Sequence, residues 1–265
     1  MRGTLHLVAA EDLPLMLAVF APLQLARGRR RLTELGLPPD DAARSTEEAA
    51  AILAEEGPLT RHELAERLRA RGVPVEAEGQ APIHVVRRAA LSGVLAEVGL
   101  RGREELYGPI DPGPLPDREA ALAELGRRYA AAHAPATAED FAAWSRLPAA
   151  DVRAAWSEPE PPPGEPHAGD VRLLPAFDEW LLGWASRDHA LSPAHTARVV
   201  RGGIIRPVAI ADGRAFATWR LDRPARRVEL EPFDAVPNGV EGAVAALGAF
   251  VGFELSWRAR RTAAG

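Results

Sequence analysis

Two stretches rich in proline and glycine set the strongest limits on how this chain of 265 residues can fold. In residues 111–116, four of the six residues are Pro or Gly, so this stretch can be neither a helix nor a central strand. Residues 158–166 are typical of a stiff, extended linker of polyproline character. The two stretches divide the chain into three parts, 1–110, 117–157 and 168–265.

The composition indicates a globular protein, because 47% of the residues are hydrophobic and 26% are charged. The chain has no cysteine, which excludes disulfide bonds, thiolate metal sites and cysteine nucleophiles. The seven histidines show no spacing typical of metal ligands, so we expect no metal. Gly202-Gly203 is not followed by a phosphate-loop pattern, so no nucleotide site is indicated and we expect no cofactor. No apolar run approaches the ~18 residues of a membrane span and no leader opens the chain, so we expect a cytoplasmic protein without a membrane partner.

The distribution of charge differs from that of a strongly basic DNA-binding domain. The formal net charge of −5 divides into −2 over residues 1–110 (14 Arg, 16 acids), −5 over 111–167 (5 Arg, 10 acids) and +2 over 168–265 (13 Arg, 11 acids). All 32 basic residues are arginine. Contacts with nucleic-acid phosphates would therefore have to come from local arginine clusters rather than from a general positive field.

Residues 45–110 show the pattern of a winged helix. An amphipathic helix over 45–56 is followed by a second helix that begins at Thr60, whose spacing to the following acid fits a capping box. A third helix is predicted over 81–92, and a short hairpin over 94–107. The order helix, helix, turn, helix, hairpin is that of a DNA-binding winged helix.

A weak internal repeat extends this pattern to residues 117–157. The Pro-Leu-Thr segment that ends at Thr60 recurs 77 residues later as Pro-Ala-Thr, ending at Thr137. In both copies an acid follows three residues after the Thr, Glu63 or Asp140, as a helix cap requires. The second copy continues into a short candidate helix at 149–156. A chance match of two cap motifs is the alternative explanation.

The last part of the chain changes from helical to strand-like patterns. An apolar run at 171–174 and alternation at 227–231 predict strands, and Asp212-Gly213 is a strong hairpin signal between two more. A helix is expected over 240–251 and a last strand over 254–258. At the other end of the chain, a strand is predicted over residues 4–8 and a helix over residues 12–26, and nothing upstream supplies a partner for that strand.

Several segments together resemble one family. These are Met1–Val8 with Glu11-Asp12, Gly57–Thr60, Leu173–Trp184 with Arg187-Asp188, and Asp212–Arg214 with Thr218–Arg220. They resemble the bacterial DNA glycosylases of the AlkZ and YcaQ type, a family of tandem winged-helix proteins, over essentially the whole chain. The resemblance implies a DNA-repair hydrolase that removes alkylated purines and unhooks interstrand crosslinks.

The residue patterns and the resemblance together predict the fold class, which is α+β. Tandem winged-helix (helix-turn-helix) modules are expected, followed by a C-terminal mixed α/β, partly barrel-like unit. The expected domains are an incomplete winged-helix remnant at 1–44, a winged helix at 45–110, a further helix-turn-helix or winged-helix module at 117–157, and the mixed α/β domain at 168–265.

One departure from the family concerns catalysis. Family members carry a Gln-x-Gln or Gln-x-Asp motif, upstream of the region that resembles this chain, which positions the attacking water. No such motif occurs here, since the only glutamines are Gln24 and Gln80. No catalytic residue is therefore assigned, and we expect the reading frame to continue upstream of Met1. The alternatives are a DNA-binding or regulatory protein without catalysis, and a helical scaffold without DNA affinity.

The candidate DNA-binding residues lie in the first part of the chain. Four arginines within five residues follow the predicted first helix and suit either phosphate contact or capping of that helix. A second group lies in or just before the predicted recognition helix over 81–92. The candidates are Arg27, Arg29, Arg30, Arg31, Gln80, His84, Arg87 and Arg88. The expected partner is damaged double-stranded DNA, bound by a monomeric protein.

The segment Leu173–Trp184 offers a second set of residues. Asp178 and Glu179 could support an oxocarbenium-like sugar, but we favour a structural role in which Asp178 pairs with Arg187 or caps a turn. Trp180 and Trp184 are four residues apart and most simply fill a core, the alternative being stacking on an extruded base.

Overall fold

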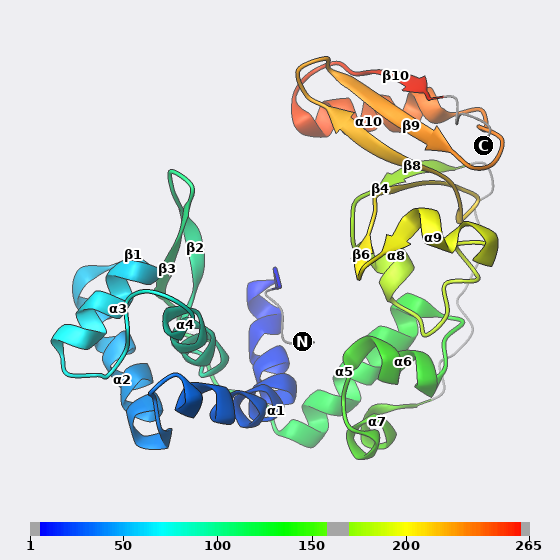
Figure 1. The fold of residues 1–265 in the computed structure, drawn as a ribbon. Coiled ribbons are helices and arrows are strands. Elements are labelled where there is room, and N and C mark those ends of the chain that lie inside the picture. The colour runs from blue at the N-terminus through cyan, green and yellow to red at the C-terminus, as the bar shows by residue number, and fades with distance from the viewer. Residues whose placement is uncertain (1–5, 158–169, 261–265) are drawn as a thin grey trace. The chain divides into compact units, whose positions relative to one another are not determined.

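The computed structural model describes residues 6–157 and 170–260. The chain forms two compact units, residues 1–125 and 126–265, whose boundary falls within one helix, α5 (Arg118–His133). Figure 1 shows helices in both units and the larger sheet near the C-terminal end of the chain. The mixed α+β class is therefore as predicted, whereas the finer division into four domains stays a prediction.

The first unit consists of helices around a small antiparallel sheet. The helices are η1 (Ala10–Asp12), α1 (Leu13–Glu34), α2 (Pro39–Glu56), α3 (Arg61–Ala70) and α4 (Ala81–Leu91). The strands are β1 (Leu59–Thr60), β2 (Leu95–Arg101) and β3 (Glu104–Pro109), in the order β1-β3-β2. Their apolar side chains meet in one core, in which Ile52, Leu64 and Leu68 are fully buried. The structure confirms, within a few residues, the helix predicted over 81–92 and the hairpin predicted over 94–107. The helix predicted over 45–56 is also present, as α2, but it begins earlier than predicted.

Both predicted capping boxes are present. The Thr60 hydroxyl accepts a hydrogen bond from the Glu63 N–H (3.3 Å), and the Glu63 carboxylate accepts one from the Thr60 N–H (2.8 Å). Thr137 and Asp140 make the same pair of bonds, at 3.2 and 2.9 Å. The bond from the Thr60 N–H is the main reason why the pKa of Glu63 is lowered. Each cap is worth about 1 kcal/mol of helix stability.

The beginning of the chain differs from the prediction in two ways. Helix α1 does not end near residue 26 but continues to Glu34, so the arginine cluster lies on the helix rather than after it. The arginines favour a helix, and Glu34 pairs with Arg30 and Arg31 at helical spacing, which offsets the roughly 1 kcal/mol that Gly28 costs in a helix. A strand is also predicted over residues 4–8. Residues 6–8 form no strand, since they pair with none of the described strands, and the rest of the predicted strand lies outside the described residues.

The second unit begins with a helical group. The end of α5 is followed by α6 (Ala138–Ser145) and α7 (Ala149–Ala155). Helices α5 and α7 approach closely at Gly126, where a Cβ atom would overlap the Ala155 carbonyl oxygen. Only glycine fits there. The close approach brings Tyr129, whose hydroxyl donates to the Gly183 carbonyl (2.5 Å), into an aromatic group with Phe141 and the tryptophans around it.

A five-stranded sheet forms the rest of the second unit. The strands are β4 (Val171–Leu174), β7 (Val208–Ala211), β8 (Arg214–Asp222), β9 (Arg227–Pro232) and β10 (Ser256–Ala259), in the order β10-β9-β8-β7-β4. Helix α10 (Val240–Val251) covers one face, against the buried side chains of Val228 and Leu230. Shorter elements pack near β7: α8 (Glu179–Leu182), η2 (Pro193–His195), α9 (Thr196–Val199), β5 (Val200–Arg201) and β6 (Ile204–Ile205).

The predicted hairpin at Asp212-Gly213 joins β7 to β8. Asp212 (φ 49°) and Gly213 (φ 77°) both adopt the left-handed conformation that a tight two-residue hairpin turn needs. The expectation of a partly barrel-like unit is corrected to an open sheet. Among the described strands, β10 pairs only with β9, in parallel, and β4 pairs only with β7, so the sheet has two edges and does not close.

Candidate nucleic-acid interface

Most of the predicted DNA-binding residues surround one hollow in the first unit. Helices α1 and α4 pack against each other, and the hollow between them has a volume of about 410 Å³. Five of the eight candidates line it: Arg27, Arg31, His84, Arg87 and Arg88. Gln80 joins the group by accepting a hydrogen bond from Arg31 (2.6 Å). Segments about 50 residues apart in the chain thus form a single cluster, which we call the α1–α4 cluster.

Uncharged acceptors hold three of these guanidinium groups. Arg87 donates to the Gln24 side-chain oxygen (2.9 Å), and Gln24 is itself only 5% exposed. Arg88 donates through Nε to the Ala42 carbonyl (2.8 Å). Arg31 donates to Gln80, as described above. These three contacts fix the direction of the guanidinium groups without cancelling their charge. For Arg87 and Arg88, whose acceptors are all uncharged, the positive charge remains available to an anion.

One carboxylate lies at the edge of the cluster. Glu34 pairs with Arg30 (2.8 Å) and with Arg31 (3.1 Å), and these hydrogen bonds lower the pKa of Glu34. Arg30, whose side chain is 90% exposed, thereby has an ionic partner outside the hollow. Arg29 is exposed and does not line the hollow either. The structure therefore groups six of the eight candidates and leaves Arg29 and Arg30 apart from them.

His84 is kept neutral at this site. Burial is the main cause that lowers its pKa, and the charges of Arg87 and Arg31 lower it further. The unperturbed value is about 6.5, so the imidazole is uncharged at neutral pH. The permanent charge of the α1–α4 cluster therefore comes from its arginines alone.

The structure adds one residue that sequence reasoning did not select. Gln24 lies in the apolar run of α1, one turn before Arg27 and two turns before Arg31, and it anchors Arg87. A lone polar residue in such an apolar run, in phase with two arginines on a helix, was the available signal.

Only Leu181 and Gly183 of the segment Leu173–Trp184 are buried, whereas Phe177 and Glu179 are exposed, so the segment lies mostly at the surface of the second unit. Asp178 caps α8 by accepting the Trp180 N–H (2.9 Å), which is the turn-capping alternative. Glu179 accepts a hydrogen bond from the Trp144 indole and lies 3.5 Å from His133 Nε2. Trp180 donates to the Gly213 carbonyl (2.8 Å). These side chains join α8 to the helical group and to the β7–β8 turn.

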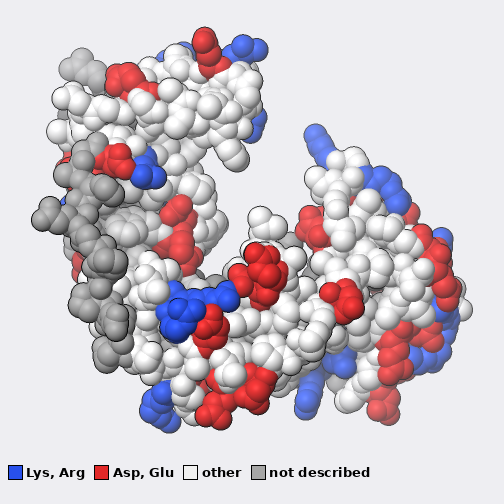
Figure 2. Space-filling model, turned by 180° about the vertical axis from the view of Figure 1, so that it is seen from behind, with Lys and Arg blue, Asp and Glu red and all other residues white. Residues whose placement is uncertain are grey.

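Over residues 6–157 and 170–260, no group of three or more His, Asp or Glu side chains is arranged to hold a metal ion. None of the helices in these residues combines the length and the hydrophobicity that crossing a bilayer requires. Figure 2 shows arginine and carboxylate side chains intermixed on the face it displays, without one continuous basic area. On that face, contact with a polyanion would therefore depend on local arginine clusters rather than on one continuous basic area.

Comparison with known proteins agrees with the resemblance found in the sequence. None of the curated proteins compared with the chain matches it. The solved structure of the Streptomyces sahachiroi DNA glycosylase AlkZ matches with a TM-score of 0.79 and 25% sequence identity, covering 98% of this chain and 80% of that one. The family described as DNA glycosylase AlkZ-like matches residues 1–251. The chain therefore belongs to the family of AlkZ-like DNA glycosylases.

Proposed function

We propose that this protein is a DNA-repair protein that binds damaged duplex DNA as a monomer and acts on alkylated purines. The observation that carries the proposal is the α1–α4 cluster, in which four arginines, Arg27, Arg31, Arg87 and Arg88, surround one hollow and three of them are directed by uncharged acceptors. Arginine binds backbone phosphate through paired N–H groups, so a cluster of this kind suits the DNA backbone. Membership of a DNA glycosylase family supports the same partner.

The arrangement of α2, α3, α4 and the β2–β3 hairpin supports a winged helix as the DNA-binding module. Helix α4 is not a freely exposed recognition helix, because Arg87 contacts α1 and Arg88 contacts α2. We therefore assign phosphate contact first to Arg27, which is exposed, and to Arg31, which is half-buried, with Arg87 behind them. The contacts fix the position of the duplex and do not read its sequence.

Base excision from an alkylated purine makes modest demands on the protein, because the cationic base is a good leaving group. A polarised water and electrostatic support for the sugar are sufficient in principle. We assign no residue to these tasks. Both glutamines of the chain are already engaged by arginines, Gln24 by Arg87 and Gln80 by Arg31, which favours a second candidate function: recognition of damaged DNA without excision.

The test is a fluorescence-anisotropy titration of the whole chain with an intact duplex and with one carrying an abasic-site analogue, over a range of salt. We expect binding that weakens with salt and that favours the abasic analogue. In the double variant Arg27→Gln/Arg31→Gln, two phosphates are no longer neutralised. The slope of log K against log salt should then become shallower by about 2, at roughly 0.9 for each phosphate.

The matched control is Arg67→Gln. Arg67 lies in the same unit but pairs with Glu56 (3.0 Å) outside the hollow, so its removal should leave the slope unchanged. Equal slopes for the wild type and the double variant would refute the role of the α1–α4 cluster. Release of free base from a duplex containing N7-alkylguanine, measured by mass spectrometry, separates excision from binding without excision.

A further inference from the structure

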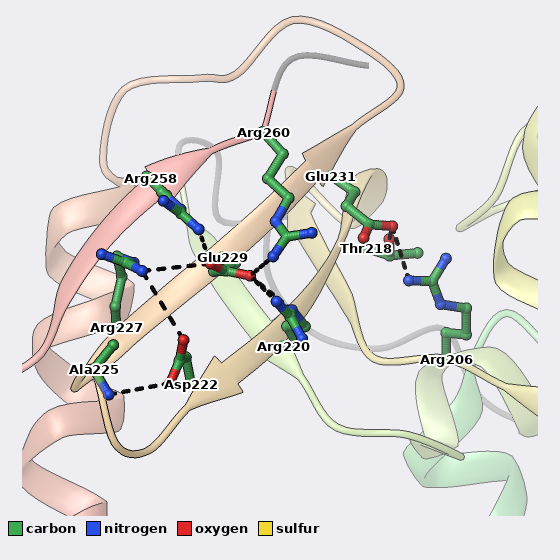
Figure 3. A network of polar contacts seen from close by, with 10 residues as sticks. All are labelled: Arg206, Thr218, Arg220, Asp222, Ala225, Arg227, Glu229, Glu231, Arg258 and Arg260. Atoms are coloured by element: carbon green, nitrogen blue, oxygen red, sulfur yellow. Dashed lines mark hydrogen bonds and ion pairs between the residues drawn. The ribbon is translucent and has the colours of Figure 1, made fainter. Parts of the chain in front are cut away.

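A second arginine cluster lies on the sheet of the second unit, and it surrounds one buried carboxylate. Glu229 in β9 is 1% exposed at its side chain. Figure 3 shows the cluster around it, which includes Arg227 (3.6 Å), Arg260 (2.5 Å), Arg220 and Arg258, all of which pair with Glu229. We call these five residues the Glu229 cluster.

Strand register brings these residues together. Arg220 in β8 and Arg258 in β10 both lie directly opposite Glu229, one on each side. Side chains directly opposite one another in neighbouring strands project from the same face. The residues that alternate with Glu229 in β9, Val228 and Leu230, pack on the other face against α10. The Glu229 cluster therefore projects from the face of the sheet that α10 does not cover.

The cluster has more positive than negative charge. Two adjacent carboxylates take part, since Glu231 pairs with Arg206 (2.9 Å) and Asp222 lies 3.9 Å from Arg227. Counting these neighbours, five arginines face three carboxylates, which leaves an excess of two positive charges. A network that served only to stabilise the sheet would gain most from equal numbers, because like charges repel.

Glu229 stays ionised and holds the arginines in place. Burial by itself raises the pKa of Glu229, but hydrogen bonds from Arg220 and Arg258 and the charges of these arginines outweigh burial and lower that pKa to about 2. The arginines remain accessible, with 56%, 49% and 43% of the side chains of Arg220, Arg258 and Arg260 exposed. A fixed carboxylate thus orders several partly exposed guanidinium groups on one surface.

We propose that the Glu229 cluster is a second DNA-contacting surface, on which Arg220, Arg258 and Arg260 bind backbone phosphates of a duplex and Glu229 acts as a positioning residue. The inference rests on the proposed DNA binding of the protein and adds a site in the other unit. Charge complementarity carries it, because planar guanidinium groups with an uncompensated charge match the geometry of phosphate.

The experiment measures binding of a duplex to the full chain by anisotropy at several salt concentrations. The double variant Arg258→Gln/Arg260→Gln is expected to lose about tenfold in affinity at low salt, with a slope shallower by about 2. The matched control is Arg172→Gln, on strand β4 at the opposite edge of the same sheet, where the side chain is 66% exposed and pairs with Asp170. The charge-retaining variant Arg258→Lys/Arg260→Lys should keep the slope of the wild type.

Glu229→Gln tests positioning separately from charge. This variant adds one unit of positive charge, so a role through charge alone predicts tighter DNA binding. Positioning predicts weaker binding, because the guanidinium groups lose the acceptor that directs them. Binding is measured below the melting temperature of the variant, which circular dichroism determines.

The outcomes are distinguishable. If the wild type binds and Arg27→Gln/Arg31→Gln weakens binding while Arg258→Gln/Arg260→Gln behaves like Arg172→Gln, this inference is wrong and the proposed function stands. If the wild type does not bind a duplex even at low salt, both are wrong. Should the sheet variants not fold, chemical modification of arginine in the wild type by phenylglyoxal decides. A bound duplex should protect Arg258 and Arg260 from modification. Unchanged reactivity in the presence of DNA would overturn the inference, and so would protection by an acidic peptide but not by DNA.

Discussion

The two arginine clusters of this protein are held in place by different kinds of acceptor. In the α1–α4 cluster the acceptors of Arg87 and Arg88 are uncharged amide and carbonyl oxygens, and Arg31 is shared between the Gln80 amide and the Glu34 carboxylate at the edge of the cluster. In the Glu229 cluster one buried carboxylate holds four arginines from three adjacent strands or their ends. The comparison teaches that arginines can be held together in two ways. Several separate acceptors can each hold one arginine, so that the loss of one acceptor affects few contacts, or one carboxylate can hold them all, so that its loss affects every arginine of the cluster.

The largest effect is expected at the shared carboxylate. Glu229→Gln leaves four arginines close together without the charge that offsets their repulsion, so the melting temperature should fall strongly. Glu34→Gln, at the edge of the α1–α4 cluster, removes a carboxylate from a mostly exposed pair and should shift the melting temperature little. Thermal unfolding followed by circular dichroism measures both, and similar shifts for the two variants would remove the distinction between the clusters.

The dependence of folding stability on acidic pH provides a second check on Glu229. The pKa of Glu229 is about 2 in the folded protein and near 4.3 in an unfolded chain, so its ionisation stabilises the fold above about pH 4.3. This contribution is lost as the pH falls from there towards 2. The wild type should therefore lose more stability over that range than Glu229→Gln does.

A smaller effect is expected at the amide acceptors. Gln24→Ala removes the acceptor of Arg87 inside the fold and should cost about 1.5–3 kcal/mol, the usual range for a hydrogen bond to a charged group. Gln80→Ala removes an exposed bond to Arg31 and should cost less than about 0.5 kcal/mol. Urea unfolding measures the difference. Equal losses would mean that burial of Gln24 does not strengthen its role.

The smallest effect concerns pH and His84. Because its pKa is lowered in the folded protein, the unfolded chain takes up the proton first as the pH falls below about 6.5. Stability should therefore decline slightly from pH 6.5 downwards until the folded pKa is passed. His84→Asn should remove this decline, and urea unfolding at pH 7.5 and 5.5 compares the two proteins. An identical pH dependence of the variant would show that His84 does not titrate in this way.

Local signals are sufficient to predict much of the fold. The caps at Thr60 and Thr137 and the Asp212-Gly213 turn depend on residues within a few positions of one another, and all three are present. The predicted end of α1 near residue 26 is wrong, because the helix passes through Gly28 and is stabilised by the pairing of Glu34 with the arginines before it.

Long-range pairing explains what sequence reasoning missed. Nothing local indicates that Gln24 accepts a bond from Arg87, 63 positions away. The Glu229 cluster is not predictable either, because it requires the register of β8 and the parallel pairing of β10, which no short pattern encodes. The arginines of α1 and α4 are candidates from the sequence, but the hollow between them follows only from the packing of the two helices.

The parallel pairing of β10 with β9 also has a consequence for the order in which the protein is made. Arg258 and Arg260 are translated after every other strand of the sheet, so a nascent chain contains Glu229 and its two earlier partners before these two exist. At that stage the Glu229 carboxylate has two of its four arginine partners, so hydration of the carboxylate is favoured over its burial. Completion of the second unit is therefore expected to wait for the last strand, because without β10 the edge of the sheet would be β9, the strand that carries the Glu229 carboxylate.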